Sequence, residues 1–185
     1  TDMRLTDGQL RYFHDFGFLR FDGLLSDRID DIVEGFERIW RDYGGGHAGR
    51  AHDGERRSAL LPFIDRDAYM STLIDDPRID GIAASILGDD YNYTASDGNY
   101  YVGDTQWHGM DLESDYSDSP RRLQSVKVAF YMDALDKETG CLRIIPGSHR
   151  RPFADRLQAL KAQHDDPGTM PFGVSGTEMP SVVLE

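Results

Sequence analysis

The first helical pattern lies near the N-terminus, where apolar residues recur at three- and four-residue spacing. Thr6-Asp7-Gly8-Gln9 has the form of a capping box, so a helix should begin there. Its apolar positions are Leu10, Phe13 and Phe16. Gly17 follows, and glycine is the residue at which helices most often end. The pattern therefore predicts a short N-terminal helix.

Three further stretches have the same amphipathic spacing. A long helix should follow Ser26, which can cap it, because one apolar stripe runs through the next four turns. The stripe consists of Ile29, Ile32, Val33, Phe36, Ile39, Trp40 and Tyr43. Another helix should begin at Asp76-Pro77, where proline occupies the first helical position, and end at Gly88. Phe153, Leu157 and Leu160 predict a short fourth helix.

Strand-like patterns lie mostly in the second half of the chain. The predicted strands are Phe18–Phe21, Tyr91–Val102 with a turn or bulge at Asp97-Gly98, Gln124–Met132, Cys141–Ile145 and the final run from Val182. Residues 44–54 lack any period and predict an exposed loop, and residues 136–140 predict a polar turn. Helices first and strands later indicate an α+β fold with an antiparallel sheet.

Length and composition narrow the class of protein. The 185 residues, 39% of them hydrophobic, suit a single domain spanning 1–185. A formal net charge of -13 opposes the phosphate neutralisation that nucleic-acid and anionic-membrane binding require, so we expect neither partner. The single cysteine, Cys141, and the absence of a long apolar run favour a cytoplasmic setting. The β-prone run at the C-terminus has no partner strand after it, so we expect the domain to be truncated there.

The most informative chemical residues are in Trp107-His108-Gly109-Met110-Asp111. An imidazole and a carboxylate a few residues apart at a strand end can share one metal ion. Two histidines and one carboxylate on one face, with the other face open, are the ligands of non-haem iron(II) oxygenases. A histidine near an aspartate is not specific by itself, so the surrounding sequence has to decide.

That surrounding sequence resembles the phytanoyl-CoA dioxygenase-like enzymes. Residues 96–108 are similar to the segment that leads into the metal-binding strand of that family. Residues 126–133 and 139–149 are similar to its strand pair, which ends in a Pro-Gly-Ser-His turn. The helix after Leu5-Thr6 and the strand entry at Gly17-Phe18 also fit, so the likeness covers most of residues 5–151.

The resemblance implies a fold and a reaction. The fold is a double-stranded β-helix, of the jelly-roll or cupin-like kind, with N-terminal helices on its major sheet and its C-terminal strands missing from this chain. The cofactor is iron(II), with 2-oxoglutarate and O2 as cosubstrates. The reaction is hydroxylation, or another oxidation, of a small molecule, with release of succinate and CO2.

The resemblance also implies which residues form the site. His108 is the first metal ligand, whereas the family's aspartate position is occupied by Met110. Asp111 can ligate only if the backbone bulges after His108, which Gly109 permits; Glu113 or no carboxylate at all are the alternatives. The distal histidine and the arginine that pairs with 2-oxoglutarate are expected beyond Glu185.

Two more residues are candidates for cosubstrate binding. Asn99 could reach 2-oxoglutarate from the strand before the metal ligand, and Phe130 occupies the position of an aromatic wall. His149 is expected to hydrogen-bond within the Pro146-Gly147 turn rather than to bind metal.

Three alternatives stay open at this stage. A halogenase of the same family would carry a small residue where this chain has Met110, which disfavours that reading. A non-catalytic binding module would also explain the missing carboxylate. An unrelated cupin-like protein would use His149 together with His108 as metal ligands.

Overall fold

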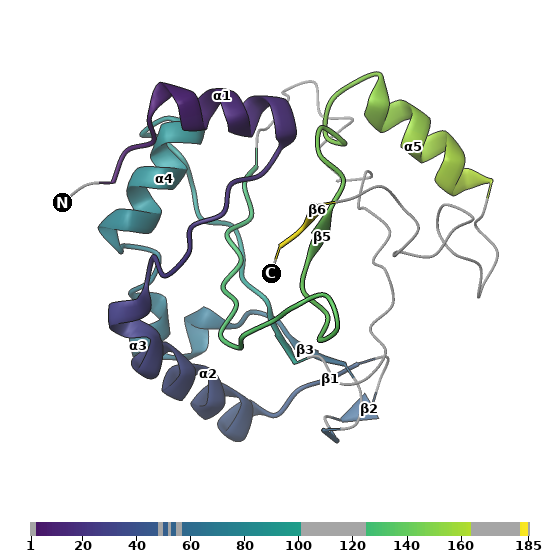
Figure 1. Cartoon of the computed structure of the whole chain (residues 1–185). Coiled ribbons are helices and arrows are strands. Elements are labelled where there is room, and N and C mark those ends of the chain that lie inside the picture. The colour runs from purple at the N-terminus through teal and green to yellow at the C-terminus, as the bar shows by residue number, and fades with distance from the viewer. Residues whose placement is uncertain are drawn as a thin grey trace. The chain divides into compact units, whose positions relative to one another are not determined.

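The computed structural model describes residues 3–47, 50–51, 53–54, 57–100, 125–163 and 182–184. The helices are α1 (Asp7–Phe16), α2 (Ile29–Tyr43), α3 (Ala68–Ser71), α4 (Pro77–Leu87) and α5 (Phe153–Ala162), with 3-10 turns at Ser26–Arg28 and Ile64–Arg66. The strands are β1 (Gly46–His47), β2 (Arg50–Ala51), β3 (Ser58–Leu60), β4 (Gly98–Tyr100), β5 (Arg143–Ile144) and β6 (Val182–Val183). Figure 1 shows these elements along the chain.

The described residues form two compact units. One unit contains α2, α3, α4 and strands β1 to β4, and the segment 128–133 belongs to it. The other contains α1, α5, β5 and β6. Helices together with small antiparallel sheets confirm an α+β fold for the described residues.

Local capping signals explain where the helices begin and end. At the start of α1, Thr6 Oγ1 accepts a hydrogen bond from the Gln9 N–H, while the Gln9 side chain accepts from the Thr6 N–H, which completes the predicted capping box. Gly17 ends the helix in the left-handed region, with φ 85°. Asp76 caps α4, and Gly88 follows its last residue, as predicted.

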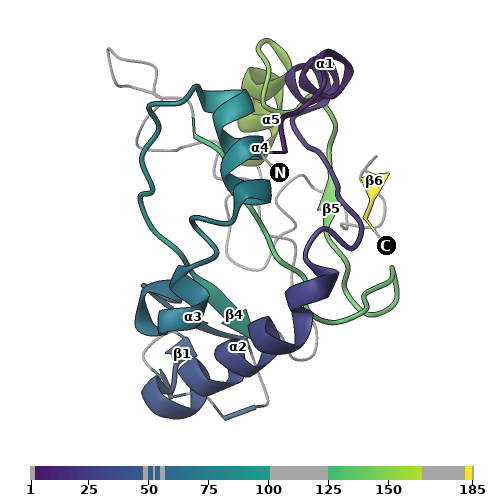
Figure 2. The ribbon, with the colours of Figure 1, turned by 90° about the vertical axis from the view of Figure 1, so that its left-hand side faces the viewer.

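The core of the larger unit forms between α2, α3 and the segment that follows β3. Its buried members are Leu25, Ile32, Phe36, Ile39, Trp40, Phe63, Met70 and Leu73. The rings of Phe36 and Phe63 lie 5.0 Å apart between centroids, and Trp40 lies 6.3 Å from Phe63. Gly35 lets α3 approach α2 closely, because a Cβ at this position would press against the Met70 side chain. Figure 2 shows α2 and α3 side by side.

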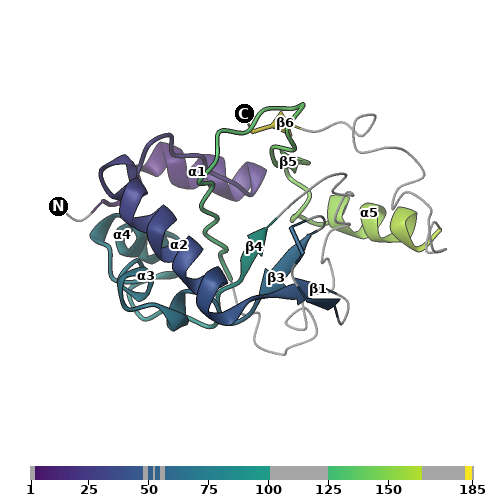
Figure 3. The same cartoon turned by 90° about the horizontal axis from the view of Figure 1, so that it is seen from below.

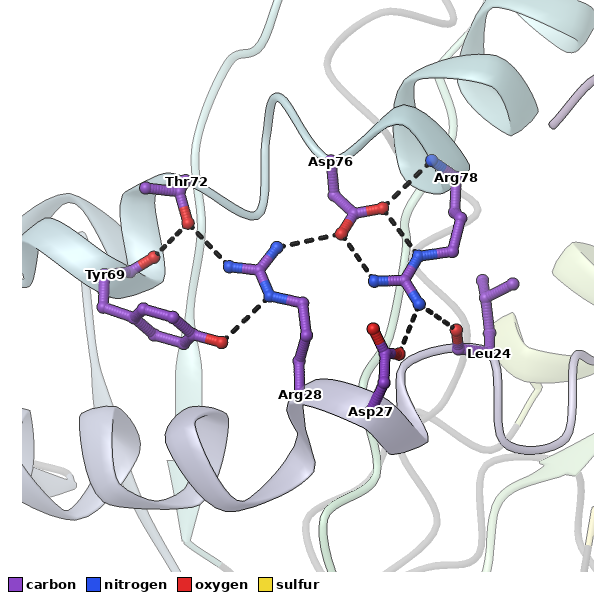
Figure 4. A network of polar contacts seen from close by, with 7 residues as sticks. All are labelled: Leu24, Asp27, Arg28, Tyr69, Thr72, Asp76 and Arg78. Atoms are coloured by element: carbon purple, nitrogen blue, oxygen red, sulfur yellow. Dashed lines mark hydrogen bonds and ion pairs between the residues drawn. The ribbon is translucent and has the colours of Figure 1, made fainter. Parts of the chain in front are cut away.

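Two arginines connect the start of α2 with the start of α4 (Figure 4). The carboxylate of Asp76 accepts hydrogen bonds from Arg28 Nη1 at 2.8 Å and from Arg78 Nη2 at 2.8 Å. Arg28 also donates to Thr72 Oγ1 and to the hydroxyl of Tyr69. Because Asp76 is 5% exposed and cannot be solvated by water, these ion pairs compensate for the burial of its charge.

Both sheets are small and antiparallel. The larger has strand order β2-β1-β3-β4, and in its β3–β4 pair Ser58 faces Tyr100, Ala59 faces Asn99 and Leu60 faces Gly98. The smaller pairs β5 with β6. Figure 3 shows β1, β3 and β4 next to one another, with α2 alongside. The double-stranded β-helix stays a prediction, since the described residues contain only these short strands.

Several strand predictions were wrong for the described residues. Phe18–Phe21 and residues 125–132 form no strand, and residues 91–97 do not belong to the strand that begins at Gly98. Cys141–Ile145 contains only the two-residue β5. Residues 44–54, predicted as a loop, contain β1 and β2. An apolar alternation makes a strand only when a partner ladder is within reach, and that partner is not encoded locally.

The end of α2 follows the prediction, but its beginning does not. Ser26 starts a 3-10 turn and makes no capping hydrogen bond, and the α-helix proper begins at Ile29. Val33 and Tyr43, expected in the apolar stripe, are 37% and 52% exposed.

No helix within the described residues is long and apolar enough to cross a lipid bilayer.

Candidate metal centre and cosubstrate site

The predicted metal ligands cannot be placed in the structure. His108 and Asp111 lie outside the described residues, as do Met110 and Glu113. Within the described ranges, no group of three or more His, Cys, Asp or Glu side chains is arranged to hold a metal ion. The donor types of His108 and Asp111, one imidazole and one carboxylate, suit iron(II), so their ligand roles stay predictions.

The strand pair that precedes the predicted ligands has two chemically different faces. Alternate residues of a strand point to opposite sides, and directly paired residues share a side. Ser58, Leu60, Gly98 and Tyr100 therefore lie on one face, and Ala59 and Asn99 lie on the other. The first, which we call the core face, packs against aromatic rings, and the second carries the amide of Asn99.

The core face of the β3–β4 pair contacts Trp40 and Phe63. Ser58 is 2% exposed, and the Tyr100 ring meets Trp40 edge-on at 5.9 Å between centroids. Gly98 lies directly against the ring of Phe63, where a Cβ would overlap the ring atoms. These contacts fix the position of β4, and therefore of the Asn99 side chain on its other face.

The chain before β4 is also fixed by hydrogen bonds. Ser96 Oγ accepts from the backbone N–H groups of Phe63 and Ile64, at 3.1 and 3.0 Å. The hydroxyl of Tyr93 donates to Asp65 Oδ2 at 2.9 Å, and partial desolvation together with this hydrogen bond raises the pKa of the tyrosine, although its side chain is 40% exposed. The strand therefore enters the sheet from a well-defined direction.

Asn99 takes part in a group of three side chains that we call the Asn99 cluster: Arg57, Asp97 and Asn99. Arg57 Nη2 donates to Asn99 Oδ1 at 3.2 Å, and Asn99 Nδ2 donates to Asp97 Oδ2 at 2.6 Å. All three side chains are partly buried. The sequence predicts a role for Asn99 but gives no signal for Arg57, which is 42 positions away, or for Asp97, whose part is visible only in its contact with the Asn99 amide.

Amide N–H groups are good donors to carboxylates, so Asn99 is the member of the Asn99 cluster that can bind one end of a dicarboxylate such as 2-oxoglutarate. Arg57 and Asp97 carry opposite charges, so the Asn99 cluster as a whole is close to neutral in a chain with a formal net charge of -13. The role of Asn99 itself stays a prediction.

Phe130 lies in the same unit as the Asn99 cluster but not in a strand. Its side chain is 37% exposed, and the neighbouring Tyr131 is 53% exposed. Two residues from Phe130, Met132 packs against the core. The predicted strand geometry for Phe130 was wrong, whereas its contact with a cosubstrate stays untested.

His149 makes a different contact from the one predicted. Its Nε2 donates to the backbone carbonyl of His14, at 3.0 Å, instead of to a group within its own turn. The ring lies over Gly17, whose missing side chain leaves the space for it. Gly147 N–H donates to the carbonyl of Phe16, so the turn satisfies two carbonyl groups at the end of α1. His149 and Gly147 therefore hold the Pro146-Gly147 turn against the end of α1.

Comparison with known proteins gives one finding. A protein-family model described as Phytanoyl-CoA dioxygenase (PhyH) matches residues 13–172, more than half of the chain. No curated protein and no solved structure gave a significant match. The family match agrees with the resemblance predicted from the sequence.

Proposed function

Because the chain belongs to the phytanoyl-CoA dioxygenase family, we propose that it is an iron(II)- and 2-oxoglutarate-dependent dioxygenase. Members of this family are generally oxygenases of that kind, act on small molecules and have a cupin-like jelly-roll fold. The proposed reaction is hydroxylation of a small-molecule carbon. When bound, iron(II) with 2-oxoglutarate and O2 supplies the oxidising power for this step.

The chain's own residues have three proposed roles. His108 and a carboxylate, for which Asp111 is the first candidate, would hold iron(II) on one side. Asn99 would donate a hydrogen bond to 2-oxoglutarate, and Phe130 would provide an apolar wall beside it. The observation that carries the proposal is the family match, which extends over the segment containing His108.

The placement of Asn99 supports this assignment. The core contacts of Gly98 and Tyr100 leave Asn99 on the opposite face of a sheet whose last strand runs directly into the predicted ligand segment. In the proposed jelly roll, the N-terminal helices cover the outside of the major sheet and the site lies on its inside. We also propose a cytoplasmic location, which the low cysteine count favours.

The direct test is anaerobic addition of iron(II) and 2-oxoglutarate to the full-length protein. A weak visible charge-transfer band should develop, and exposure to O2 should release succinate and CO2. Absence of both the band and succinate would overturn the proposed function. Chloride or bromide incorporation into product, instead of hydroxylation, would identify a halogenase.

A binding module without catalysis is the second candidate, because Met110 stands where the family carries aspartate. Metal analysis separates the two functions. A dioxygenase should take up close to one iron per chain, whereas a binding module should purify without stoichiometric iron and fail to take it up.

A further inference from the structure

We propose that Arg57 and Asp97 are positioning residues that hold the Asn99 amide in the orientation needed to donate to a carboxylate of 2-oxoglutarate. This inference rests on the proposed function, and it concerns two residues that neither the sequence patterns nor the family match identifies. The observation behind it is the pair of hydrogen bonds at opposite ends of one amide group.

An asparagine amide has two ends of similar size and opposite chemistry, and rotation by half a turn exchanges them. In the Asn99 cluster the carbonyl end faces the guanidinium of Arg57, and the NH2 end faces the carboxylate of Asp97. The exchanged orientation would place donor against donor at one end and acceptor against acceptor at the other. The cluster therefore allows one orientation of the amide.

That orientation suits an anionic ligand. One hydrogen of Asn99 Nδ2 bonds to Asp97, and the same nitrogen carries a second hydrogen that can serve a ligand carboxylate. Preorganisation of the donor lowers the entropy lost on binding, because the side chain is already fixed.

The sheet register explains how residues so far apart in sequence meet. Ala59 is directly opposite Asn99, and Arg57 lies two positions before Ala59, one residue before β3 begins. This makes Arg57 a diagonal cross-strand neighbour of Asn99, within reach of a long side chain. Asp97 lies two residues before Asn99, and alternate residues of an extended chain point to the same side, so its carboxylate can reach the Asn99 amide.

The test measures binding of 2-oxoglutarate by calorimetry under anaerobic conditions, with the full-length protein loaded with Mn(II). Asn99→Ala should raise the dissociation constant about tenfold, as expected for a lost hydrogen bond to a charged group. Arg57→Ala should raise it by a similar factor. If Arg57 acts through Asn99, the double variant should bind no more weakly than Asn99→Ala alone.

Asp97 separates positioning from simple electrostatics. Removing its negative charge with Asp97→Ala should strengthen binding of an anion if only charge matters, but weaken it if orientation of the amide matters. We expect weaker binding, and we expect Asp97→Asn to restore it, because the new amide still offers an acceptor oxygen to Asn99. Unchanged or stronger binding by Asp97→Ala would overturn the positioning role of Asp97.

Arg41→Ala is the matched control, because it removes one positive charge from an exposed side chain that pairs only weakly, at 3.5 Å, with its neighbour Asp42. It should leave the dissociation constant unchanged. Thermal unfolding of every variant checks that the fold is kept; should Arg57→Ala not fold, Arg57→Lys and the Asp97 variants carry the test.

Failure of the proposed function and failure of the positioning role give different binding results. Wild-type protein that binds no 2-oxoglutarate overturns the proposed function, and this inference with it. Wild-type binding that Arg57→Ala leaves unaltered, or additive effects in the double variant, overturns the inference alone.

Discussion

Gly98 is the residue at which β4 meets the aromatic core. A Cβ at this position would overlap the ring of Phe63, which is 2% exposed and cannot move without disturbing Phe36 and Trp40. We therefore expect Gly98→Ala to lower the free energy of unfolding by about 1–3 kcal/mol, the usual cost of overpacking a core. Denaturant unfolding measures the change.

Gly8 offers the control for that substitution. It lies in the first turn of α1, where a Cβ would meet only Thr6 Oγ1, at 3.9 Å. Gly8→Ala should leave stability unchanged or raise it by up to about 1 kcal/mol, since alanine favours helices. Equal effects of the two substitutions would contradict the close contact of Gly98 with Phe63.

His149 allows a structural residue to be separated from a metal ligand. Its ring donates to the carbonyl of His14 at the end of α1, so His149→Ala should cost about 1 kcal/mol of stability. Iron uptake by the full-length variant should equal that of the wild type. Loss of iron binding in this variant would instead support the cupin-like alternative.

Asp76 joins two helices, because its ion pairs connect the start of α2 with the start of α4. The guanidinium groups of Arg78 and Arg28 hold the pKa of the Asp76 carboxyl well below its usual range. Asp76→Asn breaks both ion pairs at a side chain that is 4% exposed, so we expect a loss of about 3 kcal/mol at neutral pH. The exposed pair of Arg4 and Asp89 is the control, and Asp89→Asn should cost under about 1 kcal/mol.

The same carboxylate predicts a pH dependence. A pKa that folding lowers gives stability that is present above the unfolded value of 3.8 and is lost as the pH falls below it. Arg38 also lowers the pKa of Asp67, so the pH dependence of wild-type stability contains contributions from several carboxylates. The difference in unfolding free energy between wild type and Asp76→Asn should narrow steadily below about pH 4. A constant difference down to pH 2 would contradict the ion-pair role of Asp76.

The elements also show which structural signals are local. Helix ends at Thr6, Gly17, Asp76-Pro77 and Gly88 follow the sequence because a cap and its partners lie within one turn. Strands depend on a partner elsewhere in the chain, which is why Phe18–Phe21 looked like a strand and is not one. The pairing of Ser58 with Tyr100 had no signal that a single sequence could supply.

For the whole molecule, the family could be recognised from sequence, but the arrangement around its site could not. The segments near His108 and Pro146-Gly147 carry family-specific residues in a continuous run. Their resemblance to the family can therefore be recognised in the sequence, and the family match agrees with it. The Asn99 cluster joins Arg57 to Asn99 through a sheet register, which leaves no motif in the chain. The predicted ligand segment lies within residues 101–124, outside the described residues, and its carboxylate is assigned by metal binding to variants.

Metal and cosubstrate binding should therefore stabilise the whole protein only when the ligand set is intact. Each ligand present at 100 times its dissociation constant adds about 2.7 kcal/mol to the free energy of unfolding, equivalent to about 5–10 °C in a protein of this size. We expect iron(II) with 2-oxoglutarate to raise the anaerobic melting temperature of the wild type by at least that amount. His108→Ala and Asp111→Ala should abolish the rise, while Glu113→Ala should keep it. Loss of the shift in Glu113→Ala alone would transfer the carboxylate role from Asp111 to Glu113, and a full shift in His108→Ala would remove His108 from the metal site.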